Sequence, residues 1–189
     1  MAAPRRVLLV IDMQRDFVSE GGALSFPAAR EILPFVREKV RKALQEGWEV
    51  VFTLDTHKED DLEFKKFPPH CLEGTEGHRL VPELEELISP YLESGQVSLV
   101  RKSRYSAFHA TDLEDFLGLK TAAGREALRE TELVGVCTNI CCFFTAEELA
   151  NRDVPVRTYA RGLASFDGQA HACALDQMEH VLGITVERE

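Results

Sequence analysis

A cysteine, Cys141, stands at the point where a short apolar run gives way to a run with helical character. Residues 133–136 predict a buried strand, and residues 140–150 predict a helix. A strand that breaks sharply into a helix presents the residues of the turn at the sheet edge, among unpaired backbone N–H groups. The helix dipole and those amides would stabilise a thiolate, so Cys141 is a candidate nucleophile. The alternative is a buried, unreactive cysteine, and the rest of the chain has to decide between the two.

Three other predicted strands also end in a residue that can do chemistry. Asp12, Asp55 and Lys102 each follow such a strand, directly or one residue later. In an open parallel sheet the carboxyl ends of all strands lie at one edge, and ligands bind there. A single polar residue after a strand is ordinary, but four such strand ends together indicate an enzyme with its site at that edge.

The segment after the second strand carries metal-ligand residues. Asp55 and His57 are spaced so that both can point to one side of the chain, and His70 arrives from the long loop at 55–79. Imidazoles combined with carboxylates suit zinc, iron or manganese. The loop holds three further oxygen donors, namely Asp60, Asp61 and Glu63. For the two aspartates, a solvated acidic surface is the simpler interpretation.

The composition excludes several classes of protein. With 189 residues, 44% of them hydrophobic and 29% charged, the chain is expected to fold as one globular domain over residues 1–189. Its net charge of −10 argues against nucleic-acid and anionic-membrane partners, which need clustered Lys and Arg. No apolar run approaches the roughly 20 residues of a membrane span, and the five cysteines lack the spacing of a disulfide framework. We therefore expect a protein of the reducing cytoplasm.

The order of the predicted elements indicates the class of fold. Apolar runs predict strands at residues 7–11, 48–54, 97–100, 133–136, 154–160 and 184–186. Apolar spacing and composition predict helices from about residue 32 to Gly47, over 80–92, from a capping box at Thr111 through Leu117, and over 120–131, 140–150 and 169–182. Pro34 is expected in the first turn of the first helix. Strands that alternate with helices within one domain mean an α/β fold with a mostly parallel sheet.

Five motifs are shared with one known family: VIDMQRDF at 10–17, TLDTH at 53–57, FPPHCLEGT at 67–75, KSRYSAF at 102–108 and GVCTNIC at 135–141. Together they resemble the nicotinamidases, or pyrazinamidases, of the isochorismatase-like cysteine hydrolase family over nearly the whole chain. The first and last motifs belong to the whole superfamily, whereas the second and third are much more specific to nicotinamidases. The resemblance implies a three-layer, doubly wound, six-stranded sheet whose strands are mostly parallel.

The resemblance also implies a catalytic triad of Asp12, Lys102 and Cys141. Asp12 would take the proton of Cys141 and later give it to the departing ammonia, while Lys102 would hold Asp12 and stabilise the developing negative charge. Attack on the amide of nicotinamide would leave a thioester, which water hydrolyses to nicotinate as a step of NAD salvage. The backbone N–H groups of Cys137 and Cys141 would form the oxyanion hole, and the peptide bond Val136–Cys137 would be cis.

A metal site and a ring-binding pair are implied in the same way. One divalent metal ion, zinc, iron or manganese, would coordinate the pyridine nitrogen and be held by Asp55, His57, Glu63 and His70. Phe17 and Phe67 match the aromatic pair that sandwiches the ring, although the second position is often tryptophan. Asn139 and Ile140 depart from the acidic and aromatic residues that many members carry, and we expect both to lie behind the nucleophile.

Two other functions stay open. An amidase of the superfamily that acts on a carbamoyl or ureido compound would generally lack the metal ligands. A non-catalytic binding member of the fold would usually lack the triad. The expected partner is the small molecule nicotinamide, and the sequence leaves open whether the protein is a homo-oligomer.

Overall fold

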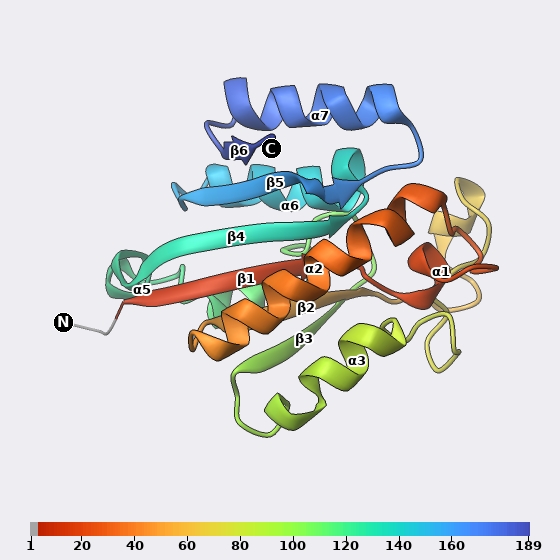
Figure 1. The fold of residues 1–189 in the computed structure, drawn as a ribbon, viewed down its shortest axis with the longest axis horizontal. Helices are drawn as coiled ribbons and strands as arrows, with labels where there is room; N and C mark the ends of the chain where they lie inside the picture. The colour runs from red at the N-terminus through yellow and green to blue at the C-terminus, as the bar shows by residue number, and fades with distance from the viewer. Residues whose placement is uncertain (1–3) are drawn as a thin grey trace.

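The centre of the fold is a sheet of six strands in the order β3-β2-β1-β4-β5-β6 (Figure 1). The computed structural model describes residues 4–189, and every strand pair in it is parallel. The strands are β1 (Arg5–Ile11), β2 (Glu49–Asp55), β3 (Val97–Lys102), β4 (Leu128–Val136), β5 (Val156–Ala164) and β6 (Thr185–Glu187). The predicted α/β class and six-stranded parallel sheet are confirmed.

The central strand β1 explains why the sheet is buried on both faces. Its residues from Val7 to Ile11 have no exposed surface. Leu8 and Val10 belong to one apolar cluster, whereas Val7, Leu9 and Ile11 belong to a second cluster. Because successive side chains of a strand point to opposite faces, an uninterrupted apolar run fits a strand that is covered on both sides.

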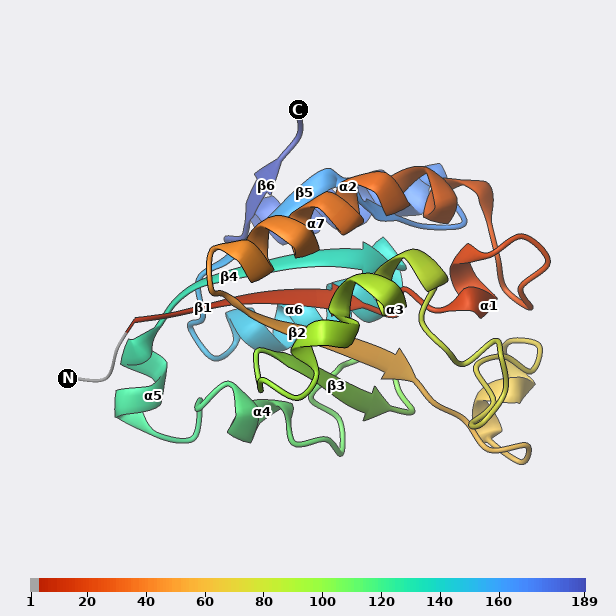
Figure 2. The same ribbon diagram turned by 60° about the horizontal axis from the view of Figure 1, so that its bottom comes forward.

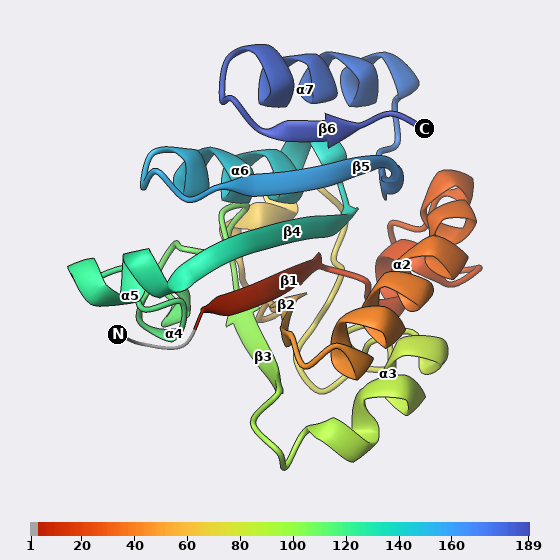
Figure 3. The ribbon, with the colours of Figure 1, turned by 60° about the vertical axis from the view of Figure 1, so that its left-hand side comes forward.

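Helices cover both faces of the sheet and complete the three layers (Figure 3). The α-helices are α1 (Arg15–Val18), α2 (Pro27–Gln45), α3 (Pro82–Ile88), α4 (Leu113–Phe116), α5 (Ala122–Ala127), α6 (Phe143–Ala150) and α7 (Gly168–His180). Two 3-10 turns, η1 (Leu62–Lys65) and η2 (Ser89–Tyr91), and one π-helical turn, η3 (Thr138–Cys142), join them. Val36 of α2 and Leu84 of α3 lie in the first apolar cluster, whereas Leu149 of α6 and Met178 of α7 lie in the second.

The carboxyl ends of β1, β2 and β4 lie together at one edge of the sheet, at the right of Figure 1. The long loop between β2 and α3, which carries η1, folds beyond that edge (Figure 2). Residues predicted to do chemistry therefore reach one region of the molecule from separate elements. Within residues 4–189, the structure has no helix that is long and apolar enough to cross a membrane.

The helix predicted over residues 120–131 is wrong for half of its length. The helix α5 covers only residues 122–127, and β4 begins at Leu128 rather than at residue 133. The early part of β4 pairs with the start of β1, since Leu128 lies opposite Arg5 and Thr131 opposite Val7. Pairing with a neighbouring strand and burial of Leu128 outweigh the helical composition of this segment.

Two other details near helix starts are also wrong. The helix α2 begins at Pro27, and proline suits the first position of a helix because no N–H donor is needed there. Pro34 therefore lies inside the helix rather than in its first turn. Pro34 is exposed, so the backbone hydrogen bond that a proline cannot donate is missing on the side of the helix that faces solvent. The capping box is not formed, because Asp112 precedes α4 without a side-chain cap and the hydroxyl of Thr111 donates to the carbonyl of Ala107.

Candidate active site

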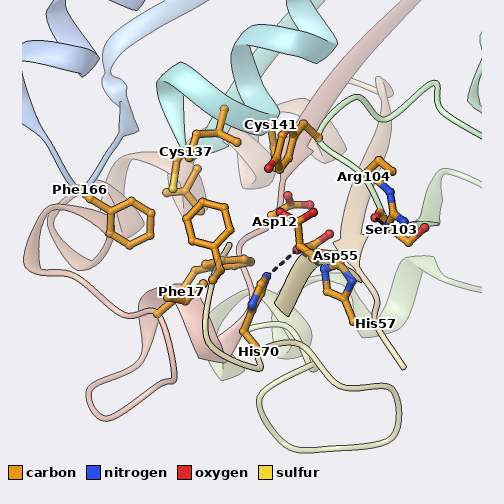
Figure 4. Close-up of a pocket in the computed structure, with 16 residues that line it drawn as sticks. Asp12, Phe17, Asp55, His57, His70, Ser103, Arg104, Cys137, Cys141 and Phe166 are labelled. Atoms are coloured by element: carbon orange, nitrogen blue, oxygen red, sulfur yellow. Dashed lines mark hydrogen bonds and ion pairs between the residues drawn. The ribbon is translucent and has the colours of Figure 1, made fainter. Parts of the chain in front are cut away.

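Lys102, the last residue of β3, joins the members of the predicted triad. Its Nζ lies 2.7 Å from Oδ2 of Asp12 and 3.4 Å from Sγ of Cys141. All three residues are buried, and Asp12 and Cys141 face the same space in Figure 4. Asp12 has a left-handed φ of 50°, which aspartate tolerates, and its Oδ1 accepts a hydrogen bond from the hydroxyl of Thr53 at 2.6 Å. The structure thus brings the three residues together.

The surroundings of Cys141 favour a protonated thiol. Burial raises the pKa of this thiol well above its usual value, and Lys102 opposes the effect only in part. Ile140 breaks the helical backbone, and Cys141 follows this break at the start of the helical run that continues into α6, as predicted. The predicted thiolate is not favoured in the resting site, because burial of the thiol outweighs the nearby ammonium of Lys102. A protonated thiol needs a base before it can attack.

Asp12 is placed to be that base. Burial raises the pKa of Asp12, although Lys102 and Thr53 favour its ionised form. Burial alone would lower the pKa of Lys102, but the carboxylates of Asp12 and Asp55 outweigh it and raise this pKa well above its usual value. A carboxylate with increased proton affinity, held beside a charged lysine, can accept the proton of the thiol.

The ligand atoms of Asp55, His57 and His70 gather in one place, within 4.8 Å of one another. Nε2 of His57 lies 3.0 Å from Oδ2 of Asp55, and Nε2 of His70 lies 3.2 Å from the same oxygen (Figure 4). All three residues are buried. Two imidazoles and a carboxylate are a donor set that suits a divalent transition metal.

Glu63 lines the same pocket but lies outside this group of three. Its Oε2 lies 2.8 Å from Nζ of Lys66, whereas its Oε1 is buried without a hydrogen-bond partner among residues 4–189. A buried carboxylate oxygen is unfavourable unless a hydrogen bond or a cation satisfies it. This oxygen, in the same pocket as two imidazoles and a second carboxylate, fits a bound divalent cation.

An apolar pocket adjoins both groups of residues. Phe17 and Phe67, predicted to hold a pyridine ring, line it, and so do Leu24, Ile140 and Phe166, which were not predicted to do so. The same pocket is lined by Asp12, Cys141 and the three clustered ligand residues, so the apolar side chains adjoin both groups. Figure 4 shows Phe17 and Phe166 on one side of this space, with Asp12 beside them.

The model of one protein family, described as the isochorismatase domain, matches residues 6–189. The chain belongs to this family. Its isochorismatase domain is similar to the crystal structure of the nicotinamidase PncA from Bacillus subtilis, with 33% sequence identity and a TM-score of 0.89. That match covers 97% of this chain and 99% of the other. The resemblance to nicotinamidases that the motifs predicted is confirmed.

Two further solved structures resemble this isochorismatase domain. The pyrazinamidase/nicotinamidase of Streptococcus mutans is 31% identical with a TM-score of 0.88, over 96% of this chain and 99% of the other. The pyrazinamidase of Pyrococcus horikoshii, solved in complex with zinc, is 28% identical with a TM-score of 0.81, over 98% of this chain and all of the other.

The turn of the isochorismatase domain that carries Cys141 has an irregular backbone. The peptide bond Val136–Cys137 is cis, as predicted. Ile140 has φ −124° and ψ −106°, which interrupts the turn, and its side chain lines the pocket. The expectation that Ile140 lies behind the nucleophile is therefore wrong.

Gly135, just before this turn, allows β4 to approach β1 closely. Its φ is +123°, and a Cβ atom there would lie 2.1 Å from the carbonyl oxygen of Ile11. The glycine of the motif at 135–141 is therefore required by the backbone that leads to Cys137 and Cys141.

Sequence reasoning missed Phe166 and Leu24 for different reasons. Phe166 lies just after β5, which ends at Ala164, whereas the predicted strand ended at residue 160. With the correct strand end, the rule that site residues follow strands would have identified Phe166. Leu24 lies in the loop before α2, where no pattern in the sequence marks a pocket residue.

Proposed function

We propose that this protein is a metal-dependent nicotinamidase, which hydrolyses nicotinamide to nicotinate and ammonia through a cysteine thioester, as a step of NAD salvage. The observation that carries the proposal is the position of Lys102. Its ammonium contacts Asp12 and Cys141 of the triad and also Asp55 of the candidate metal site, at 3.2 Å. One pocket thus holds a nucleophile, its base and a set of metal ligands.

The similar proteins support the class of enzyme. Among the proteins that match more than nine-tenths of this chain are nicotinamidases and pyrazinamidases, which bears out the predicted amidohydrolase acting on a carboxamide. An apolar pocket lined by Phe17 and Phe67, next to a cysteine, fits an aromatic carboxamide better than a flexible polar amide.

The chemistry begins with transfer of the thiol proton. The carboxylate of Asp12 takes the proton of Cys141 as Sγ attacks the carbonyl carbon of the amide. The backbone N–H groups of Cys137 and Cys141 stabilise the oxyanion, and the ammonium of Lys102 keeps Asp12 oriented. Asp12 then gives its proton to the leaving nitrogen, and ammonia departs from a thioester. Water, deprotonated by Asp12, attacks the thioester and releases nicotinate and the thiol.

Asp55, His57, His70 and Glu63 would hold the divalent ion. When bound, the ion supplies a Lewis acid that orients the pyridine nitrogen and the ring attached to it. Zinc, iron and manganese all suit the donor set, and zinc is the ion named for the pyrazinamidase of Pyrococcus horikoshii. Phe17 and Phe67 would restrict the ring to one plane between them.

Release of ammonia from nicotinamide by the purified protein tests the proposal, with the metal content of the same sample determined before and after chelation. We expect turnover that falls on chelation and returns when metal is added. We also expect that Cys141→Ala abolishes turnover while it retains the metal. No turnover by metal-loaded wild-type protein would overturn the assignment of nicotinamide as the substrate. Full activity of Cys141→Ala would overturn the thioester mechanism.

A further inference from the structure

Asp61 connects His57 to two other parts of the site. Its Oδ2 lies 2.9 Å from Nδ1 of His57, and its Oδ1 accepts the backbone N–H of Glu63 at 2.9 Å. Nη1 of Arg104 lies 3.1 Å from Oδ1 and 3.3 Å from Oδ2. The side chain of Asp61 is 11% exposed, whereas the neighbouring Asp60 is an exposed residue. The interpretation of Asp61 as a solvated surface residue is therefore wrong.

We propose that Asp61 is a positioning residue of the metal site, which fixes the ring of His57 and the backbone of Glu63 for a divalent cation. The inference rests on the metal site of the proposed function and adds a residue that is not itself among the ligands.

The two ring nitrogens of His57 have different partners. Nδ1 faces Asp61, whereas Nε2 faces Asp55 beside Nε2 of His70. An ionised carboxylate only accepts hydrogen bonds, so Asp61 holds a ring proton on Nδ1. A cation bound by Asp55 would replace the proton that faces this second carboxylate, and Nε2 is then the ring nitrogen that can bind the cation. His70 has comparable support, because its Nδ1 lies 2.8 Å from the carbonyl oxygen of Pro68. Both imidazoles thus present Nε2 to the same point.

Asp61 also sets the position of Glu63. It is the N-cap of η1, and the capped turn places the side chain of Glu63 inside the protein. Oε1 of Glu63, which has no hydrogen-bond partner among residues 4–189, lies in the pocket wall. Arg104 comes from the segment after β3 and holds both oxygens of Asp61. Figure 4 shows Arg104 and His57 on the same side of the pocket. The metal-binding loop is thereby tied to the strand that ends in Lys102.

The variant Asp61→Asn tests hydrogen bonding rather than side-chain size, because asparagine keeps the shape of aspartate but has one acceptor oxygen for three donors. The measurement is the zinc affinity of the full-length, metal-stripped protein, by competition with a chromogenic chelator. We expect Asp61→Asn to bind zinc about 10- to 100-fold more weakly than the wild type. The matched control Asp60→Asn changes the adjacent exposed carboxylate and should bind zinc as the wild type does.

A second readout reports on the ring itself. In the zinc-loaded wild type, ¹H–¹⁵N spectra of histidine side chains should show the Nδ1–H of His57 protected from exchange, and this signal should be lost in Asp61→Asn. Zinc affinity of Asp61→Asn within twofold of the wild type would overturn the proposal. So would weakened affinity with the Nδ1–H signal intact, because the ring of His57 would then be held without Asp61. A wild type that binds no zinc, iron or manganese would overturn the metal site of the proposed function together with this inference.

Discussion

The ammonium of Lys102 lies 3.2 Å from the carboxylate of Asp55, so the proposed catalytic triad and the candidate metal site share one ion pair. The same ammonium lies 2.7 Å from Asp12, and its side chain has no exposed surface. A buried cation between two buried carboxylates holds both in place and balances their charge. The two groups of residues are therefore one electrostatic unit, and a substitution of Lys102 should affect both.

Replacing this lysine tests that unit. Lys102→Met removes the cation and leaves two buried carboxylates without their partner, a change that typically destabilises a protein by about 3 to 5 kcal/mol. We expect a loss of this size in the free energy of unfolding in urea, together with loss of ammonia release from nicotinamide. Lys120→Met is the matched control, because Lys120 is an exposed lysine paired with Asp115. A Lys102→Met protein as stable as the wild type would contradict the shared ion pair.

The two aspartates that contact Lys102 should titrate in opposite directions. Burial raises the pKa of Asp12 above the ordinary aspartate value of about 3.9. Burial acts in the same sense on Asp55, but Lys102 and the two histidines outweigh it, so the pKa of Asp55 is lowered. As pH falls, Asp12 therefore takes up its proton first, and below that pKa it can no longer accept one from Cys141.

The measurement is ¹³C NMR of aspartate carboxyl groups in the metal-free protein, with Asp12→Asn and Asp55→Asn variants to assign the signals. We expect Asp12 to titrate above about 3.9 and Asp55 below it. Circular dichroism at each pH confirms that the protein stays folded. A signal of Asp12 that titrates at or below the ordinary value would refute its role as a base with increased proton affinity.

The residues at the strand ends could be predicted from the sequence because the geometry of a parallel sheet leaves them little choice. Asp12, Asp55 and Lys102 follow apolar runs, and parallel strands bring their carboxyl ends to one edge. No knowledge of side-chain direction was needed to place these residues at one site. The residue types after the second strand then indicated metal ligands, whereas the assignment of Asp12 and Lys102 to a triad was implied by the resemblance to nicotinamidases.

Residues in loops could not be predicted in this way. Asp61 and Asp60 are neighbours of the same type, and only the fold of the loop turns Asp61 toward His57 and leaves Asp60 exposed. The side chain of Ile140 reaches the pocket because the backbone breaks at that residue, which its type does not indicate. The start of β4 at Leu128 depends on pairing with Arg5, a contact between residues far apart in the chain.

Glu63 offers a test of how many residues hold the metal. Its Oε1 is buried in the pocket wall without a hydrogen-bond partner in the described part of the chain, yet Glu63 lies outside the close group of Asp55, His57 and His70. If the carboxylate moves onto the ion when metal binds, Glu63→Gln should weaken zinc affinity roughly 10-fold or more. Chelator competition gives the affinity, and Glu59→Gln, at an exposed position of the same loop, is the control. Equal affinities for Glu63→Gln and the wild type would reduce the ligand set to three residues.

Gly135 tests the packing that supports the nucleophile. A Cβ atom at this position would lie 2.1 Å from the carbonyl oxygen of Ile11, and a φ of +123° disfavours any side chain. We expect Gly135→Ala to lower the free energy of unfolding by roughly 3 kcal/mol or more, as overpacking and backbone strain add together. Gly168→Ala is the control, because a Cβ there meets no atom within 4 Å. Urea unfolding of both variants gives the comparison.

Since β4 leads directly into the turn at Cys137, any Gly135→Ala protein that does fold should also release ammonia more slowly, while its zinc affinity stays that of the wild type. Weakened zinc binding at unchanged turnover would show instead that the strand supports the metal site rather than the nucleophile.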